Sequence, residues 1–238
     1  MRTFIFSTLI LLLTTGISLA EPKKFKIEGD TLFYNTMDIE ENDYVSIRDA
    51  DIFRTLLFQN PEVVRVNLYS YGGHMEAGLE IGRVLSDFNI DTEVTKECSS
   101  ACVPIFLAGK SRELKRGGLI GFHRPAWGAE SMRDYFEDNR GSEGWTNPFA
   151  FASWVQKDIY RVAGVIFTAF AEAGVDISFA AETLKTPNDS MWYPNRQELV
   201  DAGVIHGSGI AMIKPRMRPI QPKAPEIMSE VELSLLKQ

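Results

Sequence analysis

The sequence predicts an α/β fold built around a parallel β-sheet. Between Glu62 and Pro125, three apolar segments with the character of strands alternate with two segments of helical periodicity. Strands that alternate with helices in this way pair in parallel, through right-handed crossovers. The length of 238 residues suits one domain, alone or with a tail, and the hydrophobic content of 45% is sufficient for a core.

The chain before this unit predicts a hairpin and a helix. "FKIEGDTLFYNTMDI" alternates apolar and polar residues around Gly29 and Asp30, which is typical of a β-hairpin. A helix is expected over about 48–58, because Asn60-Pro61 stops it.

The first strand of the alternating unit is "EVVRVNLYS", which ends near Ser70 and is broken by Gly72-Gly73. A helix is expected over about 74–87. Its apolar residues recur on one face: Ala77, Ile81, Val84, Leu85 and Phe88. The second strand, "IDTEVTKE", leads into a small-residue elbow at 98–100.

After the elbow, a helix is expected up to Gly109, and the third strand, "GGLIGFHRP", ends at His123. In open parallel sheets, ligands bind outside the carboxyl ends of the strands. The Gly-Gly turn, Ser100 and His123 stand at three successive carboxyl ends. Together they predict a functional site at this edge of the sheet.

The segment over 124–154 has no clear period, and we interpret it as a lid or an oligomer contact. Its aromatic residues Trp127, Tyr135 and Trp145 either line a pocket or cover this region. A long helix is expected over about 153–173.

The N-terminus predicts a signal peptide. "MRTFIFSTLILLLTTGISLAEP" combines one early cation, an apolar run and small residues before the expected cleavage site after Ala20. An uncleaved anchor is the alternative. The chain is therefore divided into a signal peptide (1–20), a domain (21–210) and a proline-rich tail (211–238) with a short terminal helix or disorder. Export places the mature protein in the periplasm or outside the cell.

Cys98 and Cys102 are the only cysteines, and an oxidising compartment lets them form a disulfide. The alternative is that they are two small buried apolar residues. Two ligands alone do not make a zinc site, so no metal is expected. The net charge of -7 argues against nucleic acid as a partner, since phosphate binding needs a basic surface.

The elbow is suited to oxyanion binding. Pro104 is tolerated only in the first turn of a helix, so the helix begins close to Ala101 and Ser100 lies at its N-terminus. The amide of Ala101 has no helical partner there. Gly72 and Gly73 allow the backbone to approach a ligand closely and present a second amide. Two such donors can stabilise a tetrahedral oxyanion.

A serine nucleophile also needs a base, and His123 at the end of the neighbouring strand can take its proton. The alternatives are that Ser100 is an N-cap and that His123 only bonds to a loop. The combination with the Gly-Gly turn favours the catalytic interpretation.

Three segments resemble the Clp protease proteolytic subunit. "CSSACVPIFLAG" resembles its nucleophile segment, and "NLYSYGGHMEAGLEIGRVL" is similar to its Ser-Pro-Gly-Gly turn and following helix, with Tyr71 in place of the proline. "GGLIGFHRP" resembles the strand that carries its histidine. The resemblance covers roughly residues 30–207 and extends to exported, uncharacterised bacterial proteins of the Clp and crotonase-like type, which often have a Cys-x-Ser-Ala-Cys elbow.

The resemblance implies a crotonase-like spiral of ββα units and a Ser-His-Asp hydrolase. Ser100 matches the nucleophile and His123 the base, while Gly72, Gly73 and Ala101 match the oxyanion hole.

The acid of this family follows the long helix, and Asp189 is our choice for the carboxylate that orients His123. The alternative is that Asn188 and Asp189 only form a turn.

We therefore expect an exported serine hydrolase, an ATP-independent peptidase that acts on peptides or proteins without a cofactor. An ATPase partner is not expected outside the cytoplasm, and a homo-oligomer is one open outcome. The first rival is a non-catalytic binding or scaffold protein. The second is an acyl-CoA enzyme, against which export and the absence of a recognisable adenine-nucleotide site argue.

Overall fold

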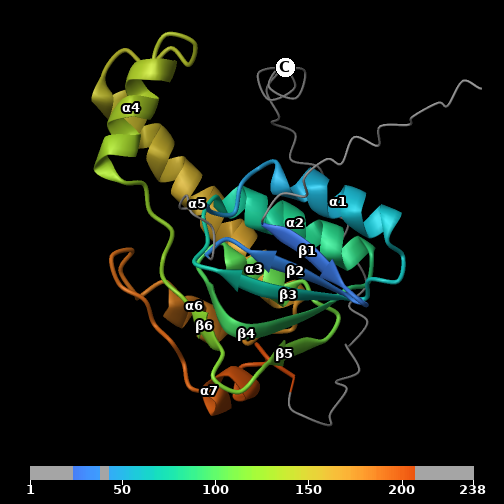
Figure 1. The fold of residues 1–238 in the computed structure, drawn as a ribbon. Coiled ribbons are helices and arrows are strands. Elements are labelled where there is room, and N and C mark those ends of the chain that lie inside the picture. The colour runs from blue at the N-terminus through green and yellow to red at the C-terminus, as the bar shows by residue number, and fades with distance from the viewer. Residues whose placement is uncertain (1–23, 38–42, 207–238) are drawn as a thin grey trace, which may run out of the picture. The chain divides into compact units, whose positions relative to one another are not determined.

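The computed structural model describes residues 24–37 and 43–206 (Figure 1). The expected signal peptide and proline-rich tail lie outside the described residues. No helix in the described part of the chain has the length and apolarity needed to cross a bilayer.

One sheet organises the fold, in the order β1-β2-β3-β4-β5, with β6 also paired to β4. β1 and β2 are antiparallel, and every other pair is parallel. The strands are β1 (Phe25–Glu28), β2 (Thr31–Asn35), β3 (Arg65–Ser70), β4 (Asp91–Ser99), β5 (Arg112–Leu114) and β6 (Leu119–Gly121). The expected hairpin and parallel sheet are confirmed.

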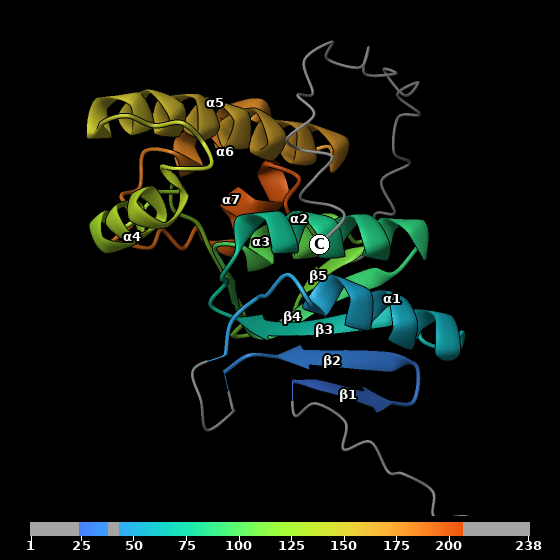
Figure 2. The same cartoon turned by 90° about the horizontal axis from the view of Figure 1, so that it is seen from above.

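Helices α1, α2 and α3 cover one face of this sheet (Figures 1 and 2). The helices are α1 (Asp49–Gln59), α2 (Met75–Asp87), α3 (Cys102–Leu107), α4 (Ala129–Asn139), α5 (Pro148–Glu172), α6 (Ile177–Thr183) and α7 (Arg196–Asp201). The expected apolar face of α2 is buried in the core, except that Phe88 is only partly covered. Pro104 lies in the first turn of α3, as its missing N–H requires.

Four elements differ from the expectation. The segment over 124–154, in which no clear period marks a helix, contains α4. The long helix begins at Pro148 rather than Ser153, because the Asn147 side chain accepts from the N–H groups of Phe149 and Ala150 and caps it. The short strand β5 and the helix α6 were not expected at all.

The apolar side of α4 packs against α5 rather than against the sheet. Its buried residues belong to a second, smaller core that we call the α4–α5 aromatic cluster. The cluster consists of Trp127, Tyr135, Phe136, Trp145, Phe151 and Trp154.

Arg112 joins the ends of three helices. Its buried guanidinium donates to the carbonyls of Leu107, Ala173, Gly203 and Val204 at 2.8–3.1 Å. These carbonyls lie at the C-terminal ends of α3, α5 and α7, where the helix dipole favours a cation. Burial lowers the pKa of Arg112 to about 10, so the side chain stays charged at neutral pH.

Candidate active site

The parallel pairing of β4 with β6 brings Ser100 and His123 together. Ser99 pairs with Gly121, and the N–H of Ser100 donates to the carbonyl of Gly121 at 3.1 Å. Two residues further along, the His123 side chain reaches over the elbow. Its Nε2 lies 2.7 Å from the Oγ of Ser100, within hydrogen-bond distance. The two residues expected to act as nucleophile and base are therefore in direct contact.

Ser100 occupies a strained backbone conformation. Its φ is +54°, in the left-handed region that residues other than glycine rarely adopt. The turn reverses the chain between the end of β4 and the start of α3, which leaves the Ser100 side chain projecting toward His123. Such outliers persist only where the surrounding structure holds them in place.

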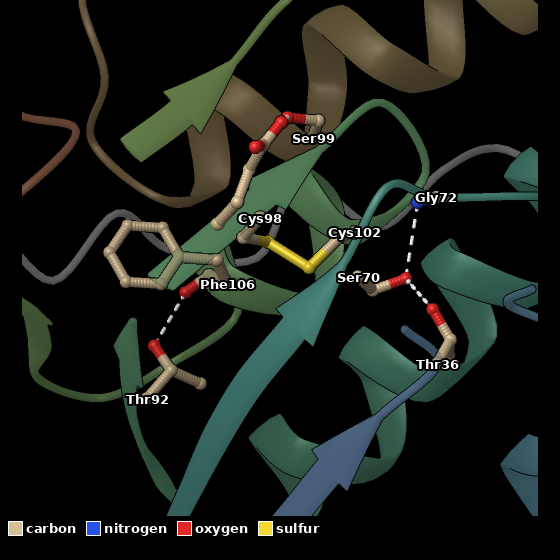
Figure 3. The surroundings of a disulfide bond; sticks show 9 residues. Thr36, Ser70, Gly72, Thr92, Cys98, Ser99, Cys102 and Phe106 are labelled. Atoms are coloured by element: carbon tan, nitrogen blue, oxygen red, sulfur yellow. Dashed lines mark hydrogen bonds between the residues drawn. A yellow bond between two sulfur atoms is a disulfide. The ribbon is translucent and has the colours of Figure 1, made fainter. Parts of the chain in front are cut away.

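A disulfide brackets this elbow (Figure 3). Cys98 and Cys102 are bonded, with an S–S distance of 2.02 Å and a Cα–Cα distance of 5.3 Å, and both are fully buried. Of the two interpretations of this pair, the structure supports the disulfide, which in turn favours an oxidising compartment. The bridge does not hold the elbow away from His123.

Gly72 lies directly against the elbow, and Gly73 lies against Val45. Their φ values are +105° and +149°. A Cβ added at Gly72 would lie 2.7 Å from the Cβ of Ser100 and 2.8 Å from the N of Ala101. Only glycine can therefore occupy this position without displacing the elbow.

The three residues expected to form the oxyanion hole differ in what their amides do. The N–H of Gly72 donates to the Ser70 Oγ at 3.1 Å, so it is already engaged. The N–H groups of Gly73 and Ala101 donate no hydrogen bond within the described part of the chain. Gly73 and Ser100 line the same cavity. The amides of Gly73 and Ala101 are therefore unengaged, and the contribution of Gly72 is its lack of a side chain.

The far nitrogen of His123 has no partner. Nδ1 is buried and makes no hydrogen bond to any described residue. Burial lowers the pKa of His123, the backbone of Arg124 partly offsets the shift, and no carboxylate contributes to it. Asp189 is exposed and its carboxylate accepts from the Ser190 hydroxyl at 3.4 Å. The structure therefore forms the Ser100–His123 pair without the carboxylate that was expected to orient the imidazole.

Two cavities meet at this pair. The larger, of about 460 Å³, runs between the start of α2 and the segment over 125–128, and is lined by Tyr44, His74 and Trp127 among others. The smaller, of about 30 Å³, is lined mainly by apolar side chains of α2, α3 and α5. Ser100 and His123 line both cavities. The pair therefore borders both a wide groove and a small apolar pocket.

Sequence reasoning missed the residues that support the Gly-Gly turn. Val45 forms an isolated parallel bridge with Gly73, in which the N–H of Val45 donates to the carbonyl of Gly72 at 2.8 Å. The hydroxyls of Ser70 and Thr36 form a hydrogen bond of 2.8 Å. These contacts join segments that are far apart in the chain, and no local pattern marks them.

Comparison with known proteins shows the fold. No family model and no curated protein matches the sequence. Among solved structures, a ClpP1 mutant from Listeria monocytogenes matches with a TM-score of 0.52 and 19% identity, over 74% of this chain and 89% of its own. The chain is therefore an α/β protein with a parallel sheet and a fold similar to that of ClpP, and the likeness at this identity extends to the fold alone.

Proposed function

We propose that this protein is an exported serine hydrolase, a ClpP-like peptidase that works with a Ser100–His123 dyad. The observation that carries the proposal is the 2.7 Å contact between Ser100 Oγ and His123 Nε2. The unengaged amides of Ala101, in the elbow, and of Gly73, in the adjoining turn, support it. A nucleophile, a base within hydrogen-bond reach and an oxyanion site are the parts that acyl transfer needs.

The geometry supports a sequence of proton transfers between the two residues. Neutral His123 accepts the Ser100 proton at Nε2 while Oγ attacks the substrate carbonyl. The amides of Gly73 and Ala101 then bind the oxyanion of the tetrahedral intermediate. The imidazolium returns its proton to the leaving group, which leaves an acyl-enzyme on Ser100. Water attacks this ester by the same route in reverse and releases the acid.

Burial supports the role of His123 as a base. Because the pKa of His123 is below its ordinary value, the imidazole is neutral at neutral pH and can accept a proton. The carboxylate proposed at Asp189 would act only if the loop after α6 brought it to Nδ1. We therefore assign the dyad as the working form.

The cavities suggest which substrates the site takes. The small apolar pocket beside Ser100 suits a short apolar side chain or acyl chain, while the larger groove has room for an extended peptide. The proposed substrate is a peptide or protein with a small apolar residue on the acyl side of the scissile bond. An ATPase partner and a cofactor form no part of the proposal.

The test compares purified mature protein with Ser100→Ala and His123→Ala on short-chain p-nitrophenyl esters and a peptide library. We expect turnover that both substitutions remove, and a preference for short acyl chains. Folded wild-type protein that turns over no ester or peptide would favour the binding or scaffold alternative. Light scattering of the same sample tests whether the protein forms a homo-oligomer.

A further inference from the structure

The Gly-Gly turn is held from behind by a chain of buried hydroxyls (Figure 3). Thr36 follows β2, Ser70 ends β3, and both are almost fully buried. The Oγ1 of Thr36 lies 2.8 Å from the Oγ of Ser70, which accepts from the N–H of Gly72 at 3.1 Å. The chain thus runs across two neighbouring strand ends to the turn beside the nucleophile.

We propose that Thr36 and Ser70 are positioning residues, whose hydroxyls orient the Gly72–Gly73 turn so that the Gly73 amide faces the reacting carbonyl. The inference rests on the proposed hydrolase function, because it assigns Gly73 an oxyanion to bind. Neither hydroxyl touches the substrate; both act through the backbone.

The direction of the Gly73 amide follows from the planarity of the peptide. The carbonyl of Gly72 accepts from the N–H of Val45 and therefore points toward Val45. In a trans peptide the N–H and C=O point in opposite directions, so the N–H of Gly73 points away from Val45. Val45 thus fixes the carbonyl of Gly72, and the hydroxyl of Ser70 fixes its N–H.

A turn of two glycines needs such supports. Glycine adopts positive and negative φ with similar ease, so nothing in Gly72 or Gly73 themselves fixes the peptide plane between them. The hydroxyl of Ser70 rotates freely unless a partner fixes it. The bond to Thr36 supplies that partner, which leaves a lone pair of Ser70 directed at the Gly72 N–H.

The experiment compares four variants. Thr36→Val and Ser70→Ala remove the two hydroxyls, and Thr36→Ser keeps the hydroxyl while removing a methyl group. Thr92→Val is the matched control, since Thr92 is equally buried and its hydroxyl donates to the carbonyl of Phe106 at 2.7 Å, outside the turn. Each variant is assayed for kcat and KM on a short-chain ester and for melting temperature.

Loss of one oxyanion donor lowers kcat by about 100-fold or more, so a misaligned donor should cost a large part of this. We expect Thr36→Val and Ser70→Ala to lower kcat by about 10- to 100-fold with little change in KM, because the oxyanion forms only in the transition state. Thr36→Ser should retain wild-type kcat. Thr92→Val should lower the melting temperature and leave kcat within about twofold of wild type. Unchanged kcat in Thr36→Val and Ser70→Ala, or an equal loss in Thr92→Val, would overturn the inference.

A second measurement does not depend on turnover. The amide NMR signals of Gly72 and Gly73 should shift, and Gly72 should exchange faster with solvent, in Ser70→Ala and Thr36→Val but not in Thr92→Val. Signals that stay at their wild-type positions would refute the positioning role even in an active enzyme. Shifted signals in a protein without Ser100-dependent turnover would support the positioning role of the two hydroxyls and refute the hydrolase proposal. Failure of the positioning role and failure of the proposed function therefore give different results.

Discussion

Reduction of the Cys98–Cys102 disulfide should weaken both the fold and the nucleophile elbow. The bridge closes a ring of five residues, from Cys98 to Cys102. In the chain-entropy model, a loop of this size stabilises the folded state by about 2 kcal/mol. For a domain of this length, that corresponds to a fall in melting temperature of about 4–8 °C.

The loss of activity should exceed what the loss of stability explains. Ser100 lies inside the ring with φ of +54°, and release of the ring lets this residue relax toward an ordinary conformation. A preference of about 1.4 kcal/mol for the relaxed form would lower the reaction rate about tenfold. The folded, reduced protein should therefore react about tenfold more slowly with a fluorophosphonate.

The assay uses protein that is unfolded, reduced and refolded with a reductant present, because the buried bridge is closed to reductants in the folded state. Urea unfolding gives the free energy of each form, and the rate of phosphonate labelling gives the reactivity at a temperature where both are folded. A double variant, Cys98→Ala with Cys102→Ala, is the control and should not respond to the reductant. Equal stability and equal labelling rates in the oxidised and reduced wild type would refute this reasoning.

Four further predictions test individual parts of the account. Gly72→Ala should lower kcat by at least about 100-fold, because the new Cβ collides with the elbow. Gly117→Ala is the control: Gly117 also has a positive φ but has open space around it, so this variant should lose stability and keep its kcat. Comparable kcat values in the two variants would contradict this prediction. Asp189→Asn should change kcat less than about threefold, while a loss near the 10⁴-fold typical of a triad aspartate would mean that Asp189 reaches the imidazole during turnover. Burial lowers the pKa of His123, so the acidic limb of kcat/KM should lie below pH 6.5, and a limb above that value would contradict the lowered pKa. Arg112→Met should lower the free energy of unfolding by about 3–5 kcal/mol in urea titrations, because four buried carbonyls lose their hydrogen-bond donor. A loss below about 1 kcal/mol would show that these carbonyls find other partners.

The alternating unit was predictable because its signals are local. The apolar face of α2, the glycines that end β3 and the position of Pro104 each constrain a few neighbouring residues. Once the strands are known to be parallel, their carboxyl ends must meet at one edge. The order of elements therefore places Ser100 and His123 at the same edge, and the pairing of β6 with β4 brings them into contact.

The remaining features depend on contacts between distant segments. The apolar residues of α4 do recur at helical spacing, but which element they pack against depends on the distant α5. The bridge between Val45 and Gly73 and the bond between Thr36 and Ser70 join three separate segments. The choice of Asp189 rested on its place in the chain, and place in the chain does not determine which way an exposed loop turns its carboxylate.

The central claim is that the Ser100 hydroxyl is a nucleophile activated by His123, and peptide mapping of the phosphonate adduct tests it most directly. The wild-type protein should acquire one phosphonyl group, carried by the peptide that contains Ser100, and His123→Ala should acquire it far more slowly. Modification at a different residue, or wild-type protein that stays unmodified while its circular dichroism shows it to be folded, would contradict the account.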